Sequence, residues 1–311
     1  PIGARHRSGS GNAITEFGMS LTHQANAAAG NYFVSPYSVH TALSMTLAGA
    51  RGQTAQQMQK VLQLDSVKDV AGTNQALQKH LQAARDKGGF ELNVANALWS
   101  APDASFDADF TKLIATQYGG GLKTVDFTQS EPATHAINQW VSEQTRQKIP
   151  ELIPAGVLGR DTRLVLTNAI YFKAPWTMPF SPEATQPGDF HSAGSDGAAE
   201  TVKVDLMHQT GELRYFEDSE LQAVELPYGQ GDEAMLVLLP RDRAGIGAVQ
   251  KSLSAGRIDK IVAGLKSRQV RLTLPKFTLR YRVDLVKTLS EMGMTDAFGT
   301  KADFSGMSLT E

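Results

Sequence analysis

The order in which two periodicities follow one another constrains this fold more than any other feature of the sequence. Through the first third of the chain, apolar residues recur at helical spacing, as Val39, Leu43 and Leu47 do. From Phe90 onward the apolar runs become strand-like, and they do not alternate regularly with helical segments: FELNVANALW, LVLTNAIYF, AVELPYG, MLVLLP and VRLTLPKF. This order predicts an α+β fold and argues against a doubly wound parallel sheet.

Local capping signals predict the starts of two helices. Ser35 followed by Pro36 predicts a helix start, because the hydroxyl can accept an otherwise unpaired amide and proline lacks the amide that would be wasted. Thr54 and Gln57 have the spacing of a capping box and predict the start of a third helix. Pro275 predicts a bend or an exposed edge at the end of its strand. Further helices are expected over residues 14–29, over 73–87, around 137–141 and over 285–292.

Size and charge limit the classes of partner. A chain of 311 residues can bury a large core, and one large domain is the simplest expectation. Lys and Arg total 30 against 32 for Asp and Glu, so the bulk charge does not favour nucleic acid or an anionic membrane. The first 15 residues lack the apolar core of a signal peptide, and no apolar run reaches the length of a membrane span.

The usual signatures of catalysis and of metal binding are missing. There is no cysteine, which excludes disulfides, thiolate metal sites and a cysteine nucleophile. There is no G-x-S-x-G elbow, H-E-x-x-H pair or phosphate-binding loop, and the seven histidines show no ligand-like pairing. We therefore expect neither an enzyme nor a cofactor, since an enzyme or small-molecule binder would need a convergent polar constellation.

One helix carries a run of positive charge. Lys79, His80, Arg85 and Lys87 lie within the segment 73–87, and such a face can bind a sulfated polysaccharide or another polyanion. Asp86 interrupts the run. A simple solvated helix face is the favoured interpretation, with polyanion binding as its alternative.

Several motifs, taken together and in order, resemble those of the serpin family of protease inhibitors. The segment NYFVSPYSVHTALSMTLAGARGQTAQQMQKVL is similar to the family's N-terminal helical motif. The match continues in the family's order through INQWVSEQTRQKIPELI, TRLVLTNAIYFKAPW, VELPYG with MLVLLP, LPKF, and GMTDAF with ADFSGM. The resemblance covers nearly the whole chain, from about residue 14 to residue 307.

The resemblance implies a single serpin domain over residues 1–311 with about eight or nine helices and three sheets. It also implies a monomeric, extracellular or secreted suicide inhibitor of a serine protease, with a cysteine protease as the alternative target. In that mechanism the cleaved reactive loop enters the main sheet as a new strand. A non-inhibitory serpin acting as a carrier, chaperone or structural protein is the main rival.

The same resemblance implies roles for particular residues. The strand that should flank the inserted loop covers residues 164–172 and includes Leu164, Leu166, Ile170 and Phe172. Ser35, Ser38 and Asn168 match the shutter, where hydrogen bonds control sheet opening; the simpler interpretation makes Ser35 a helix cap and Asn168 a satisfied core amide. Trp176 and Lys276 match the breach, the end of the sheet where the loop first enters.

The sequence is expected to stop before the inhibitory segment. In the family, ADFSGM precedes another main-sheet strand, the hinge, the reactive loop and the final strands, whereas this chain ends at Glu311. The reactive bond is therefore expected to be absent from the chain, and with it the residue that selects the protease. A minor departure is Ala174, which stands where the family often has glycine.

Overall fold

The computed structural model describes residues 9–25, 31–118, 121–193, 199–279, 281 and 283–308. Within these ranges the helices are α1 (Gly9–Ala25), α2 (Pro36–Gly49), α3 (Gly52–Val61), α4 (Val70–Asp86), α5 (Ala108–Gln117), α6 (Ser130–Gln144), α7 (Ile246–Ser252), α8 (Ala255–Gly264) and α9 (Leu285–Glu291). The strands are β1 (Glu91–Ser100), β2 (Gly121–Thr124), β3 (Leu164–Lys173), β4 (Gln186–Ala193), β5 (Ala199–Glu217), β6 (Leu221–Tyr228), β7 (Glu233–Pro240) and β8 (Lys266–Pro275). Helices come first and strands dominate later, which confirms the α+β prediction.

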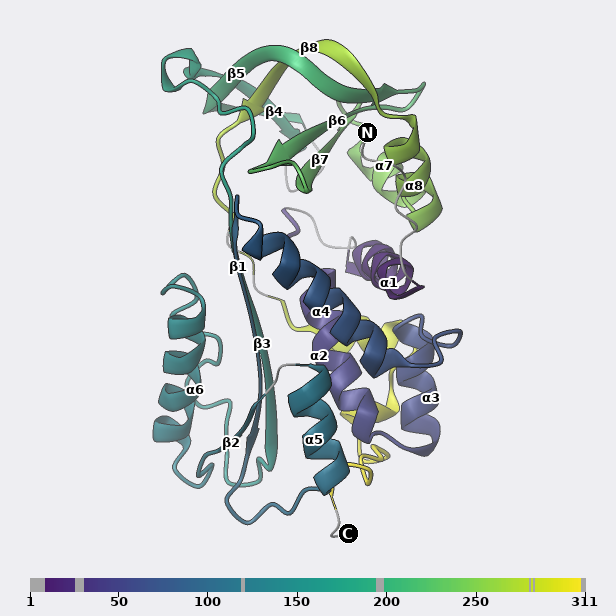
Figure 1. Ribbon diagram of the computed structural model, residues 1–311, viewed down its shortest axis with the longest axis vertical. Coiled ribbons are helices and arrows are strands. Elements are labelled where there is room, and N and C mark those ends of the chain that lie inside the picture. The colour runs from purple at the N-terminus through teal and green to yellow at the C-terminus, as the bar shows by residue number, and fades with distance from the viewer. Residues whose placement is uncertain are drawn as a thin grey trace.

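The strands of the described residues form two sheets (Figure 1). The first has the order β2-β1-β3, with β1 antiparallel to β3 and parallel to β2. The second joins β4, β5, β6 and β7 in that order, and β8 pairs with β5. Three sheets were expected. The difference arises because β5 is 19 residues long and pairs with β4 near one end and with β6 near the other, so two neighbouring sheets become one connected sheet.

Helices cover both faces of the β2-β1-β3 sheet. Figure 1 shows α6 alone on one side, with α2, α4 and α5 on the other. The strands β1 and β3 pair over their full ten residues, from Glu91 opposite Lys173 to Ser100 opposite Leu164. This long antiparallel ladder is the frame on which the candidate site is built.

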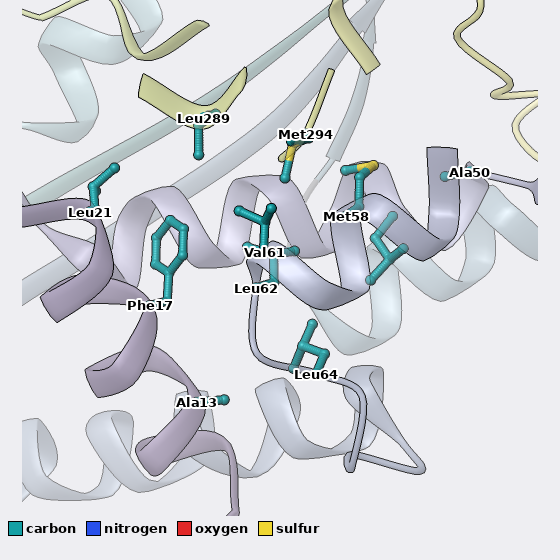
Figure 2. Close-up of a cluster of buried hydrophobic side chains, with 11 residues drawn as sticks. Ala13, Phe17, Leu21, Ala50, Met58, Val61, Leu62, Leu64, Leu289 and Met294 are labelled. Atoms are coloured by element: carbon teal, nitrogen blue, oxygen red, sulfur yellow. The ribbon is translucent and has the colours of Figure 1, made fainter. Parts of the chain in front are cut away.

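The largest apolar core lies among the helices, away from both sheets. Phe17 and Leu21 of α1 meet Met58 of α3 and its C-cap Leu62, and Met294 after α9 completes the cluster (Figure 2). All five side chains are fully buried. At roughly 1.5–3 kcal/mol for each large apolar side chain, this cluster alone anchors the helical half of the molecule.

The local signals are mostly confirmed, with one helix start misplaced. Ser35 caps α2 as expected, β8 ends at Pro275, and a turn separates β6 from β7. The capping-box prediction at Thr54 is wrong: α3 begins at Gly52 with Arg51 as its N-cap. The Thr54 hydroxyl instead accepts the backbone N–H of Asp303, 249 residues later, so a tertiary contact has taken the group that the local pattern assigned to a cap.

The structure tests only part of what was predicted for membrane spans and for the N-terminal segment. Within the described ranges, none of the helices combines the length and apolar character needed to cross a bilayer. The prediction that a signal peptide is missing rests on the first 15 residues, of which residues 1–8 lie outside the described residues. The first predicted helix begins at Gly9, earlier than expected, and its expected end at residues 26–29 also lies outside them.

Candidate functional site: the free edge of β3

The strand β3 has one paired edge and one free edge. Its inner edge bonds to β1 along all ten residues, while no strand of the described residues pairs with its outer edge. About half of the backbone N–H and C=O groups of such a strand point outward without a strand partner. Within the described residues, the outer edge of β3 is therefore a strand edge with unpaired backbone groups.

Side chains of β3 alternate between two helix-covered layers. Leu164 and Leu166 pack with Leu98 and with residues of α2 and α5. On the opposite face Val165 packs against the cluster that includes Ile137 of α6. Because both layers continue to the free edge, an added strand could place its own alternating side chains in the same two environments.

Asn168 lies at the middle of the strand and takes part in a chain of amide hydrogen bonds. Its Nδ2 donates to Oδ1 of Asn96, its register partner on β1, at 2.5 Å. The Nδ2 of Asn96 then donates to the backbone oxygen of Tyr118 at 3.0 Å. The Oδ1 of Asn168 is buried without a hydrogen-bond partner. A buried, half-satisfied amide of this kind is costly to disturb and sensitive to any opening of the sheet.

The helix α2 carries another buried polar group, at its contact with the end of α3. His40 is fully buried, its Nε2 lies 3.0 Å from the backbone oxygen of Leu62, and its Nδ1 lies 3.4 Å from the hydroxyl of Ser44. Burial lowers the pKa of His40 from an ordinary 6.5 to about 4, although the bond to Leu62 opposes this shift. The imidazole is therefore neutral at physiological pH and joins α2 to the end of α3.

Aromatic side chains gather at the C-terminal end of β3. Trp176 stacks on Tyr228 with ring centroids 4.6 Å apart and planes at 16°. Phe172 meets the edge of Tyr228 at 5.3 Å and lies 5.6 Å from Phe90. Burial raises the pKa of the Tyr228 hydroxyl, so this phenol is neutral. The cluster joins the ends of β1 and β3 to the turn between β6 and β7.

A cavity of about 460 Å³ opens beside this aromatic cluster. Ile170 and Phe172 of β3 line one wall and Leu77 and Leu81 of α4 line another. Phe172 is 43% exposed, although it lies in an apolar strand. The aromatic end is thus loosely enclosed, whereas the middle of the strand is buried.

Comparison with known proteins settles the family. A family model described as serpin, a serine protease inhibitor, matches residues 12–311. The chain belongs to the serpin family.

Named relatives and solved structures agree with this assignment. Ipis-1 of Ixodes persulcatus is 36% identical over 307 residues, covering 96% of this chain and 80% of the relative. The leukocyte elastase inhibitor of Xenopus tropicalis is 38% identical over 306 residues, covering 95% and 80%. Emu ovalbumin superposes with a TM-score of 0.90 at 28% identity over 98% of this chain and 82% of that one. A cleaved Serpin 42Da gives 0.87 at 28% identity, covering 96% and 80%. The serpin resemblance drawn from the motifs is confirmed.

In this serpin, the three residues matched to the shutter do not form one hydrogen-bonded unit. Ser35 caps α2, accepting the backbone N–H of Ser38 at 3.2 Å, as the simpler interpretation expected. Among the described contacts, no hydrogen bond joins either serine to Asn168, whose partner is Asn96. A signal for Asn96 was available, since it is also a polar residue inside an apolar strand. Ser35, Ser38 and Asn168 therefore keep their shutter role only as a prediction.

The residues matched to the breach are also separate. Trp176 belongs to the aromatic cluster, while the backbone N–H of Lys276 donates to the oxygen of Asp205 at 2.8 Å. The Lys276 side chain is exposed and makes no ion pair among the described residues. Sequence reasoning missed Tyr228 and Phe90, because only tertiary contact identifies them. The breach assignment stays a prediction.

Other candidate sites gain little from the structure. On α4 and its C-cap, Arg85 pairs with Asp86 at 2.8 Å and Lys87 pairs with Asp232 at 3.5 Å, which leaves Lys79 as the exposed cation of the suggested polyanion face. Within the described ranges, no group of three or more His, Asp or Glu side chains is placed to hold a metal ion.

Proposed function

We propose that this protein inhibits serine endopeptidases by adding a strand of its own, released by cleavage, to the free edge of β3. Loop insertion is the general serpin mechanism, applied here to named residues. The observation that carries the proposal is β3 itself, a ten-residue strand of a serpin-family chain whose two faces are already covered by helices.

The energetics favour such an addition. A new strand beside Leu164, Leu166, Ile170 and Phe172 would satisfy the outward backbone groups of β3 and bury apolar side chains in both layers. Phe172 and the cavity beside it are the parts of the edge with most apolar surface left to cover. Entry at the aromatic end is supported by this loose enclosure, because no hydrogen bond between buried side chains has to break there first.

The identity of the target follows from the relatives, at the level of class. The Xenopus relative is named a leukocyte elastase inhibitor, which supports an elastase-like serine protease as the partner of this chain. The protein acts as a consumed inhibitor and not as an enzyme, since one cleavage commits one molecule. The monomeric state, the extracellular location and the polyanion site at Lys79, Arg85 and Lys87 stay predictions.

A protease panel tests the proposal. The chain spans about 80% of the length of several relatives, so the product of the whole reading frame that contains residues 1–311 is the protein to use. It is incubated with elastase, chymotrypsin, trypsin and subtilisin, with papain as the cysteine-protease arm, and run on denaturing gels. We expect a stable band at the summed mass with at least one serine protease.

The control is the same protease with its active-site serine blocked beforehand, which must give no such band. Complete cleavage of the inhibitor without any covalent band, for every protease, would overturn the proposal and favour a non-inhibitory serpin. A band with papain alone would move the target to the cysteine class.

A further inference from the structure

We infer that Lys123 on the edge strand β2 is a positioning residue that latches α6 onto the sheet. Its Nζ lies 5.6 Å from the ring centroid of Trp99 on β1 and 5.7 Å from that of Trp140 on α6. An ammonium within about 6 Å of an indole face is attracted by the negative face of the ring. One cation therefore joins the strands β1 and β2 and the helix α6.

The geometry of the two rings prepares the site. Trp99 and Trp140 meet edge to face, with centroids 5.7 Å apart and planes at 79°. Two faces at this angle form the walls of a corner, and the Lys123 ammonium occupies it. The indole N–H of Trp99 donates to the Thr167 hydroxyl at 3.0 Å, which fixes the orientation of the first wall.

Register brings the cation to the corner. Trp99 and Lys123 are direct partners in the parallel β1–β2 pair, so their side chains lie next to each other on the same face of the sheet. That face is the one covered by α6, where Ile137 and Val141 are fully buried. Among the described residues Lys123 makes no ion pair, so the two rings are its charge partners.

The Lys123 contact matters for strand addition because α6, and the connection from α6 to β3, cover one face of the sheet at β3. Val141 of α6 packs with Ala169 of β3, and Ile149 and Leu152 of the connection pack against the same cluster. Side chains of an added strand would have to enter that layer. Lys123 holds α6 from the β1–β2 side. It therefore influences how readily α6 and the connection after it move away from β3. This consequence rests on the proposed function, while the latch itself does not.

A simpler role for Lys123 makes a different prediction. Lysine on an edge strand often only discourages pairing with another chain. In that case its removal would promote self-association and leave α6 unaffected. Hydrogen exchange of the α6 amides, residues 130–144, separates the two roles without any protease.

The variants are Lys123→Met, which removes the charge and keeps the apolar stem, and Lys123→Arg, which keeps a cation. Lys148→Met, at an exposed lysine in the connection after α6, is the matched control. We expect Lys123→Met to speed α6 exchange about five-fold, the order expected for losing one partly desolvated cation–π contact. Lys123→Arg and Lys148→Met should stay within about two-fold of the parent.

Exchange over β1, residues 91–100, reports global stability in the same experiment. Equal acceleration of β1 and α6 in Lys123→Met, or unchanged α6 exchange, would overturn the latch. In the full-length protein, Lys123→Met should also form its covalent protease complex faster than the parent. If no variant forms a complex but α6 exchange responds as expected, the proposed function fails and the latch stands.

Discussion

The middle and the aromatic end of the β1–β3 ladder are built on different physical principles. Around Asn96, Asn168 and Trp99 the ladder is buried, and the side-chain N–H groups of these three residues have directional partners. Around Phe172 and Trp176 it is aromatic, bordered by a cavity, and held by ring contacts without a side-chain hydrogen bond between the rings. Directional bonds fix one arrangement, whereas aromatic contacts tolerate several. The contrast supports a sheet that is locked in its middle and adaptable at one end.

Acidification should weaken the contact between α2 and the end of α3. His40, which is buried there, is neutral in the fold with a pKa of about 4, against 6.5 when unfolded. The unfolded chain therefore takes up a proton first, so the stability is fully present above pH 6.5 and is lost progressively as the pH falls toward 4. The full loss is about 3 kcal/mol. Denaturant titrations between pH 7 and pH 4 measure it, with His40→Gln as the control that should remove most of the His40 slope.

Gly229 tests how tightly the aromatic end is tied to its neighbours. Its φ is +48°, and a Cβ there would meet the backbone oxygen of Gly89 at 2.5 Å. Gly229→Ala should cost about 2–3 kcal/mol of unfolding free energy, from strain and overlap together. Gly231→Ala is the matched control, because its φ is +90° but no atom lies within 4 Å of the added Cβ. Equal losses in the two variants would show that the Gly89 contact is unimportant.

Asn168 tests the locked middle directly. Asn168→Ala removes the donor to Asn96 and leaves a buried amide oxygen unpaired, which should cost about 2 kcal/mol. Asn93→Ala on the same ladder removes only a 3.4 Å bond to Gln144 and should cost less than about 1 kcal/mol. We also expect faster polymer formation on mild heating for Asn168→Ala, seen on native gels. If Asn168→Ala lost no more unfolding free energy than Asn93→Ala, the claim that Asn168 stabilises the middle of the ladder would be wrong.

The smallest expected effect is the difference between two tryptophan variants, one in the buried part of the ladder and one at its aromatic end. Trp99→Phe loses the indole bond to Thr167, whereas Trp176 makes no hydrogen bond of its indole among the described contacts. Trp99→Phe should therefore cost about 1 kcal/mol more than Trp176→Phe. Chemical denaturation of both variants gives the difference. A larger loss at Trp176 would contradict the contrast between the two regions.

Sequence reasoning found the ladder because its signals are local. Largely apolar runs predicted β1 and β3, and Ser35 with Pro36 predicted the start of α2. What it missed depends on register and on distant partners. The pairing of Asn96 with Asn168 depends on the register of two strands, with 72 residues between the partners. The Thr54 hydroxyl accepts the backbone N–H of Asp303 and does not cap its own helix.

The aromatic end and the Lys123 corner were beyond sequence reasoning for the same reason. Trp176 was matched through the motif, but its stacking partner Tyr228 comes from another sheet. Lys123 has no neighbour in sequence that marks it, since Trp99 and Trp140 reach it from separate elements. Such sites become visible only when the fold brings three segments together.

The central claim is that β3 can gain a strand and that the gain is favourable. Scanning calorimetry of the full-length protein, before and after a non-target protease nicks its exposed loop, tests it most directly. Burying two or three apolar side chains of an inserted strand contributes about 5 kcal/mol. That gain should raise the melting temperature by about 10 °C or more for a domain of this size. A melting temperature that stays level or falls after nicking would contradict strand addition at the free edge of β3.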